Sequence, residues 1–161
     1  MVYIVMGVSG AGKSLIGSKL ARELRLPFFD ADHFHPQENI TKMESSQPLN
    51  DRDRWPWLQR LRKNIAQWEQ EGGAILACSA LKRSYRRVLA PPEIPMQFIY
   101  LKGPEKLILK RMNQRDGHFM PEELLASQFD ALEEPAQAIT VNIDQSPAEI
   151  VRSLCKKISG N

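Results

Sequence analysis

The chain has 161 residues, of which 42% are hydrophobic and 25% are charged, and its formal net charge is +3. This length and composition predict one soluble globular domain spanning residues 1–161, with a buried core of its own. Because no apolar stretch is long enough for a secretory leader or a membrane span, we expect a cytoplasmic protein without a membrane partner.

The first predicted element is a buried strand at residues 2–6, formed by the apolar run VYIVM. The next residues, GVSGAGKS, match the pattern G-x-x-x-x-G-K-[ST] of the P-loop, and apolar residues recur at helical spacing after it. Strand, glycine loop and helix in this order form the context in which the motif binds nucleotide phosphates. The predicted nucleotide-binding residues are Gly7, Val8, Ser9, Gly10, Ala11, Gly12, Lys13 and Ser14. Lys13 is expected to reach the β- and γ-phosphates and Ser14 to ligate Mg²⁺, so the predicted cofactors are ATP and Mg²⁺.

The rest of the chain alternates between predicted strands and helices. Further strands are expected at residues 27–30, 74–78, 96–101 and 139–143, and helices at 51–71, 81–89, 104–114 and 121–132. A last helix begins at Ser146-Pro147-Ala148-Glu149, a capping box with proline at the first helical position. Five short apolar strands separated by helices predict an α/β fold, in which helices flank a five-stranded parallel sheet on both faces.

Polar residues follow three of the predicted strands directly. Gly7, Asp30 and Ser79 each stand where a strand ends. Ligands bind such sheets at the carboxyl ends of the strands. We therefore expect these polar clusters to converge at one edge of the sheet.

The segment after the second strand, Asp30-Ala31-Asp32-His33-Phe34-His35, carries two acids. In an extended segment Asp30 and Asp32 would point the same way, as would His33 and His35. We assign Asp32 as the base that takes a proton from an acceptor hydroxyl. Asp30 is the candidate for a further contact to Mg²⁺, directly or through water, because the strand at 74–78 does not end in an acid. The alternative is that both acids form an exposed turn or a helix cap; a zinc site is disfavoured, since no further ligands have suitable spacing.

These residues resemble the gluconokinase family. The resemblance is carried in order along the chain by residues 6–14, 30–36, 48–58, 77–86, 117–121 and 127–135. The blocks Leu-Asn-Asp at 49–51, Cys-Ser-Ala-Leu-Lys at 78–82 and Gly-His-Phe-Met at 117–120 are more specific than the P-loop. The resemblance implies ATP-dependent phosphorylation of D-gluconate to 6-phosphogluconate, which feeds sugar acid catabolism and the pentose phosphate pathway. It also implies the P-loop fold of the shikimate and nucleoside kinases, with a lid, and a homodimer.

A polyol with one carboxylate needs cations and hydrogen-bonding groups in its site. Arg54, Lys82 and Arg86 are the candidate cations, although Arg86 could equally be a surface charge. Asn50 is a further candidate for the hydroxyls. The predicted substrate-binding residues are Asp32, His35, Arg54, Ser79, Lys82, Arg86, His118 and Gln128.

A polar segment between two predicted helices is expected to form the lid, at about residues 111–127, with Gly117 as a possible hinge. Arg111 and Arg115 are the candidates for closing on the γ-phosphate, a contact worth about 10³–10⁵ in rate. One of them could instead contact the adenine or the α-phosphate. Together with Lys13 and Asp32 they make up the predicted catalytic set.

Three other functions fit parts of the sequence. A kinase of the same fold acting on shikimate or a nucleoside monophosphate shares the P-loop and the Asp-x-Asp segment, but not the specific blocks. A nucleotide-binding module without catalysis would not need a base or lid arginines. The basic helix at 81–89 lacks the interleaved aromatic residues of a nucleic-acid surface, so no nucleic-acid partner is expected. Cys78 and Cys155, without C-x-x-C spacing, are expected to be buried thiols and not a disulfide or a metal site.

Overall fold

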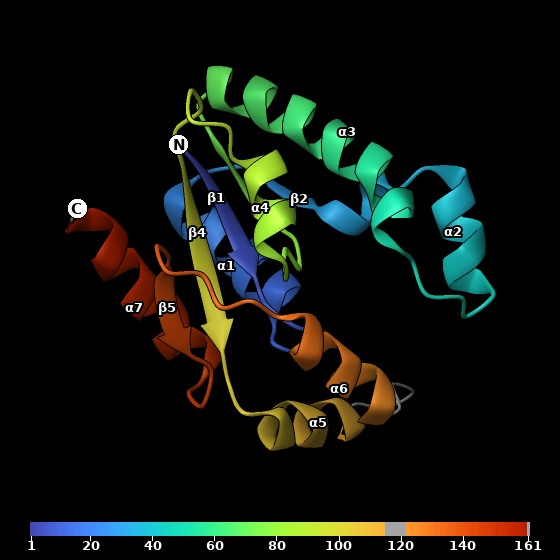
Figure 1. Cartoon of the computed structure of the whole chain (residues 1–161). Coiled ribbons are helices and arrows are strands. Elements are labelled where there is room, and N and C mark those ends of the chain that lie inside the picture. The colour runs from blue at the N-terminus through green and yellow to red at the C-terminus, as the bar shows by residue number, and fades with distance from the viewer. Residues whose placement is uncertain (115–121, 161) are drawn as a thin grey trace.

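The computed structural model describes residues 1–114 and 122–160. Five strands form a fully parallel sheet in the order β2–β3–β1–β4–β5 (Figure 1), which confirms the predicted fold class. The strands are β1 (Val2–Met6), β2 (Phe28–Asp30), β3 (Ala74–Ala77), β4 (Met96–Lys102) and β5 (Ile139–Asn142). All five lie within one residue of their expected bounds.

In the described residues, six α-helices and one short 3₁₀ segment connect the strands, and a seventh α-helix follows the last strand. They are α1 (Lys13–Leu24), η1 (Ala31–Phe34), α2 (Gln37–Glu44), α3 (Asp51–Gln70), α4 (Arg83–Leu89), α5 (Glu105–Asn113), α6 (Glu122–Ala131) and α7 (Pro147–Ser159). The sequence did not predict η1 or α2. None of the helices in the described part of the chain is long and apolar enough to cross a bilayer.

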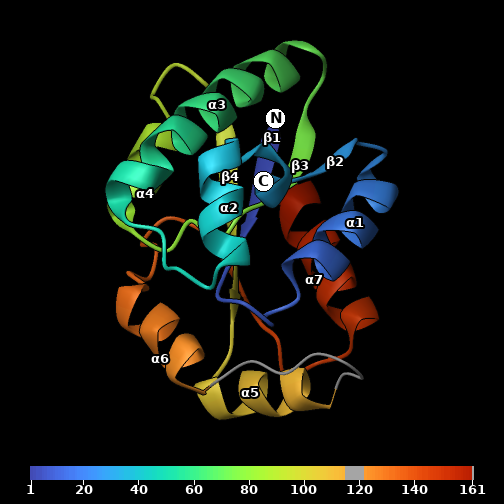
Figure 2. The same ribbon diagram turned by 90° about the vertical axis from the view of Figure 1, so that its right-hand side faces the viewer.

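The two faces of the sheet pack against different helices (Figure 2). Val5 of β1 belongs to the core on the side of α1 and α7, where Leu20 and Leu154 are fully buried. Its neighbour Ile4 belongs to the core on the side of α3 and α4, with Leu61 and Leu89. Successive side chains of a strand point to opposite faces, so a strand covered on both sides has to be apolar throughout, as β1 is.

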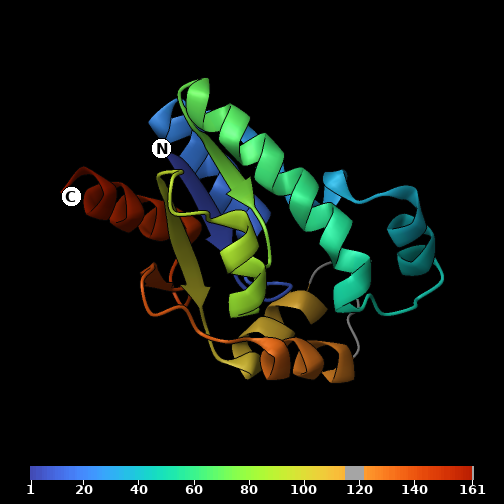
Figure 3. The ribbon, with the colours of Figure 1, turned by 45° about the horizontal axis from the view of Figure 1, so that its top comes forward.

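The strand register brings the expected polar clusters to one edge. Ala77 of β3 pairs with both Val5 and Asp30, so β1, β2 and β3 end nearly level. The amide of Gly7 donates to the Ser79 carbonyl at 3.4 Å, which joins the start of the P-loop to the residue after β3. Helices α5 and α6 lie beyond the same ends of the strands (Figure 3).

Two capping boxes fix helix starts. The box predicted for α7 is confirmed, since the Ser146 hydroxyl accepts from the Glu149 amide and the Glu149 carboxylate accepts from the Ser146 amide. A second box joins Asn50 and Asp53 at the start of α3. The Asn50 side-chain oxygen is therefore used as a cap, and the expected role of Asn50 toward a sugar hydroxyl stays a prediction. Asp53 also pairs with Lys42 at 2.8 Å and so ties α2 to α3.

Candidate active site

A pocket of about 1050 Å³ opens at the carboxyl edge of the sheet. The P-loop forms its floor, the segment from Asp30 to His35 and the start of α3 form one wall, and α6 forms another. Among the residues predicted from the sequence, those that line it are Ser9, Gly10, Gly12, Lys13, Ser14, Asp30, Asp32, His35, Arg54, Ser79 and Gln128. The structure thus brings the phosphate loop and much of the expected acceptor site into one cavity.

The P-loop has a backbone conformation that suits an anion. Gly10 and Gly12 have φ angles of +80° and +98°, which glycine adopts without a steric penalty. Because Gly12 immediately precedes α1, the amides of the loop and the positive end of the helix act at the same place. The Lys13 ammonium donates to the Val8 carbonyl at 3.0 Å. Burial lowers the pKa of Lys13, so a phosphate beside it would compensate a poorly solvated cation.

Ser14 and Asp30 meet at the edge of this loop. The Ser14 hydroxyl donates to Asp30 Oδ2 at 2.9 Å. A hydroxyl oxygen and a carboxylate side by side are oxygen ligands of the kind that Mg²⁺ uses together with water and phosphate. The residues present therefore fit the expected metal ion.

The expectation of an extended segment at Asp30–His35 is wrong. The Asp30 side chain accepts from the Asp32 amide at 3.0 Å and caps the 3₁₀ turn η1. The helix-cap alternative thus describes Asp30, yet both carboxylates still line the pocket. The turn also separates the two histidines, since His33 is exposed and His35 is buried.

His35 is held in one protonation state by its neighbours. Its ring stacks on Trp57 with centroids 4.4 Å apart. Asn39 Nδ2 donates to the Asp53 carbonyl at 2.9 Å and lies 3.1 Å from His35 Nδ1. Since a carbonyl only accepts, this Asn39 group is the NH₂, His35 Nδ1 is an acceptor, and the proton of the neutral ring is on Nε2. Burial lowers the pKa of His35, which favours that neutral form.

Of the three cations expected to meet a sugar acid, Arg54 is the one that lines the pocket. Lys82 lies outside the lining and pairs with Asp51 at 3.2 Å. Arg86 has framework partners in the structure, and its expected contact with the sugar acid stays a prediction. Its buried guanidinium donates to three backbone carbonyls, at 2.7 Å from Ala80, 3.0 Å from Leu81 and 2.7 Å from Glu133. Arg86 therefore joins α4 to the segment that follows α6.

Gln128 lies against the P-loop itself. Its Oε1 accepts from the Ser9 amide at 2.7 Å, and its Nε2 donates to the Ser9 hydroxyl at 2.8 Å. The next residue of the loop, Gly10, is covered by Met112 of α5. A Cβ placed on Gly10 would lie only 2.5 Å from the Met112 side chain. Helices α5 and α6 are thus both packed on the phosphate loop.

The lid prediction falls partly outside the described residues. Arg115 and His118 lie outside the described residues. Arg111 lies in the last turn of α5. Its Nη1 donates to the Ile143 carbonyl, just after β5, at 2.6 Å, and Arg111 is not part of the pocket lining.

The sequence did not predict the apolar part of the pocket wall, nor the contribution of α2 to it. Met43, Leu49, Trp57 and Leu124 contribute lining and were not among the predicted site residues. Cys78 also lines the pocket, but burial raises the pKa of its thiol to about 12, so it is not a nucleophile at neutral pH.

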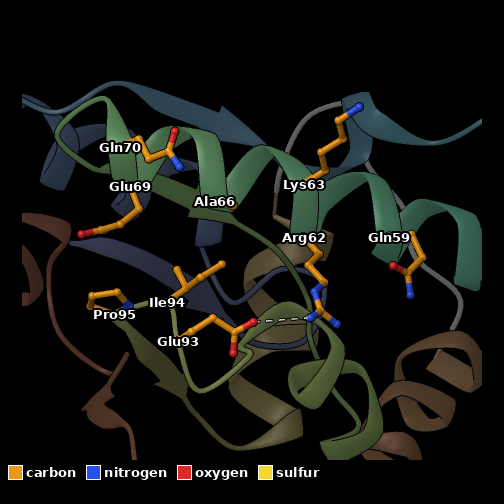
Figure 4. A pocket seen from close by; sticks show the side chains of 9 residues that line it. All are labelled: Gln59, Arg62, Lys63, Ala66, Glu69, Gln70, Glu93, Ile94 and Pro95. Carbon is orange, nitrogen blue, oxygen red and sulfur yellow. Dashed lines mark ion pairs between the residues drawn. The ribbon is translucent and has the colours of Figure 1, made fainter.

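A second hollow, of about 580 Å³, lies between α3 and the connection from α4 to β4 (Figure 4). Arg62 and Glu93 form an ion pair across it at 3.8 Å. It contains no residue of the P-loop or of the acidic segment after β2. The chemistry described above therefore belongs to the first pocket.

A parallel α/β fold whose phosphate loop shares one pocket with a carboxylate and an arginine defines a P-loop kinase for small molecules. Comparison with known proteins agrees. The family model described as shikimate kinase matches residues 9–159. The thermoresistant gluconokinase of Escherichia coli is 41% identical, over 98% of this chain and 93% of that protein, and the gluconokinase of Gluconobacter oxydans is 39% identical, over 95% and 88%. The chain therefore belongs to the gluconokinase family.

Solved structures support the same assignment. The gluconokinase from Sinorhizobium meliloti is 40% identical, with a TM-score of 0.85 over 98% of this chain and 95% of that one. The shikimate kinase from Aquifex aeolicus, 19% identical, has a TM-score of 0.73 over 100% of this chain and 98% of that one and shares the fold.

Proposed function

We propose that this chain is a gluconokinase that transfers the γ-phosphoryl group of ATP to D-gluconate and so makes 6-phospho-D-gluconate. The observation that carries the proposal is the single pocket in which the P-loop, Asp32 and Arg54 meet. Membership of the gluconokinase family supports the choice of acceptor.

On the nucleotide side, the amides of the P-loop and the start of α1 hold the phosphates, and Lys13 exchanges its hydrogen bond with the Val8 carbonyl for a phosphate oxygen. Ser14 and Asp30 would hold Mg²⁺, which when bound supplies positive charge against the charge that develops on the phosphates. Gln128 holds Ser9 and so keeps this part of the loop in place.

On the acceptor side, a hydroxyl oxygen of gluconate attacks the γ-phosphorus as the bond to the β-phosphate oxygen breaks, and the hydroxyl proton passes to Asp32. His35 Nε2–H and the Ser79 hydroxyl are donors for the other hydroxyls. Arg54 binds the carboxylate.

We also propose that the segment at about 111–127 closes over both substrates and that Arg111 or Arg115 reaches the γ-phosphate, with His118 toward the acceptor. The resemblance to the family further supports a cytoplasmic homodimer. Light scattering on the purified protein tests the assembly, and a monomer mass at the enzyme's working concentration would reject it.

The first experiment measures ADP release from Mg²⁺-ATP with D-gluconate, shikimate, AMP or no acceptor. We expect rapid turnover with gluconate alone. Turnover with shikimate or AMP would assign a different acceptor. ATP binding without acceptor-dependent turnover would favour a nucleotide-binding module.

A further inference from the structure

Tyr85, which no motif singled out, connects α4 to the start of α3. Its hydroxyl donates to Asp51 Oδ1 and accepts from Arg54 Nη1 at 3.3 Å. A tyrosine hydroxyl has one proton, and it donates this proton in the hydrogen bond to the anionic Asp51. The hydroxyl oxygen is then left as an acceptor, which suits the guanidinium of Arg54.

The Tyr85 ring also lies beside two cations. The Arg54 guanidinium carbon and the Lys82 ammonium are each 5.5 Å from the ring centroid, within the range of a cation–π interaction. The two cations differ in their partners, because the charge of Lys82 is paired with Asp51 in an ion pair. The positive charge that remains for a ligand in the pocket is that of Arg54.

The hydrogen bonds of Arg54 occupy one end of its guanidinium. Nη1 donates to the Leu49 carbonyl at 2.7 Å and to Tyr85, which uses both of its N–H groups. Among the described residues, the side-chain hydrogen bonds of Arg54 involve Nη1 alone. The edge formed by Nη2 and Nε is the one that can bind a carboxylate with two parallel hydrogen bonds.

We propose that Tyr85 is a positioning residue that, with Asp51 behind it, presents the Nη2–Nε edge of Arg54 to the carboxylate of the sugar acid. This inference rests on the proposed function and makes its acceptor site more specific. Tyr85 acts through Arg54 and does not itself touch the reacting atoms.

The test is steady-state kinetics of Tyr85→Phe, which keeps the ring and its packing and removes only the hydroxyl. We expect the KM for gluconate to rise about 3- to 10-fold, the size of one lost hydrogen bond, with the KM for ATP unchanged. Tyr100→Phe is the matched control, because Tyr100 is also a buried tyrosine of the same core cluster. We expect this variant to leave both KM values unchanged.

Arg54→Ala should raise the KM for gluconate further, and adding Tyr85→Phe to it should have no additional effect, because the two residues act as one unit. Additive effects, an unchanged KM in Tyr85→Phe, or a rise in the KM for ATP would each overturn the proposal. If Tyr85→Phe folds poorly, Asp51→Asn is a second variant, for which we expect a smaller rise in the KM for gluconate. Failure of the wild-type protein to use gluconate would instead reject the proposed function.

Discussion

At the scale of single residues, Asp30 and Asp32 show how partners give two identical carboxylates different roles. Asp30 accepts from the Ser14 hydroxyl and the Asp32 amide, so both of its oxygens are in use. Asp32 is exposed to the pocket and is a negative neighbour of the Lys13 ammonium. A base needs an oxygen that a substrate proton can reach, which favours Asp32 for that role.

Replacing Asp32 with Asn removes the base and keeps the size of the side chain. We expect kcat to fall about 10²- to 10⁴-fold, the usual contribution of a positioned base, with little change in the KM for ATP. Steady-state kinetics with Mg²⁺-ATP and gluconate measure the effect. Asp144→Asn, in the exposed turn after β5, is the control. A change in the KM for gluconate alone would make Asp32 a binding residue instead.

His35 predicts a dependence of stability on pH. Its pKa in the folded chain lies below the ordinary value of about 6.5 because the ring is buried. Well above pH 6.5 the ring is neutral in both the folded and the unfolded chain, and its full contribution to the free energy of unfolding is present. As pH falls below 6.5 the unfolded chain binds the proton first, so the free energy of unfolding decreases until pH reaches the folded pKa.

Urea denaturation at pH 7.0 and pH 5.5 measures this loss. The variant His35→Phe keeps a ring to stack on Trp57 and has no proton to bind, so we expect a smaller loss between the two pH values. His33→Phe, at the exposed histidine two residues earlier, should retain the loss of the wild type. Equal losses in the wild type and in both variants would show that another group is responsible.

At the scale of the elements, Arg86 shows that a buried charge can be part of the framework. Arg86→Met keeps an unbranched apolar stem, removes the guanidinium, and leaves the Ala80, Leu81 and Glu133 carbonyls without this donor. An unsatisfied buried group costs about 1–3 kcal/mol, so we expect a loss of stability of at least this size in denaturant unfolding. Arg87→Met, at the exposed neighbour on the same helix, should cost little.

The kinetics of Arg86→Met then separate the two roles considered for this residue. A framework role predicts an unchanged KM for gluconate in the folded fraction, measured at a temperature well below the transition. A large rise in that KM with unchanged stability would restore Arg86 to the substrate site.

Elements with a strong local signal were predicted, and those that depend on distant partners were not. The apolar runs gave the strands, and the P-loop and the Ser146–Glu149 box gave two helix starts. Helix α2 was missed although Ile40 and Met43 have helical spacing, since it is short and mostly polar and is held by Lys42 pairing with Asp53 of α3. The partners of Arg86 were equally hidden, because Glu133 lies 47 residues further along the chain.

At the scale of the whole molecule, the pocket is assembled from parts that the chain joins only at the edge of the sheet. The P-loop follows β1, the acidic segment follows β2, Ser79 follows β3, and α6 closes the other side. A ligand that contacts these parts binds the folded chain and not the unfolded one. Its binding free energy therefore adds to the stability of the whole domain.

We expect each substrate to raise the melting temperature separately. At a concentration 100 times its Kd, a ligand adds about 2.7 kcal/mol, which corresponds to about 5–11 °C for a domain of this size. Lys13→Ala should weaken the shift produced by Mg²⁺-ATP and leave that produced by gluconate, because Lys13 belongs to the phosphate loop and the sugar acid is held by Arg54 and its neighbours. Differential scanning fluorimetry with each ligand alone measures both shifts. Loss of the gluconate shift in Lys13→Ala would mean that the two halves of the pocket do not bind their ligands independently.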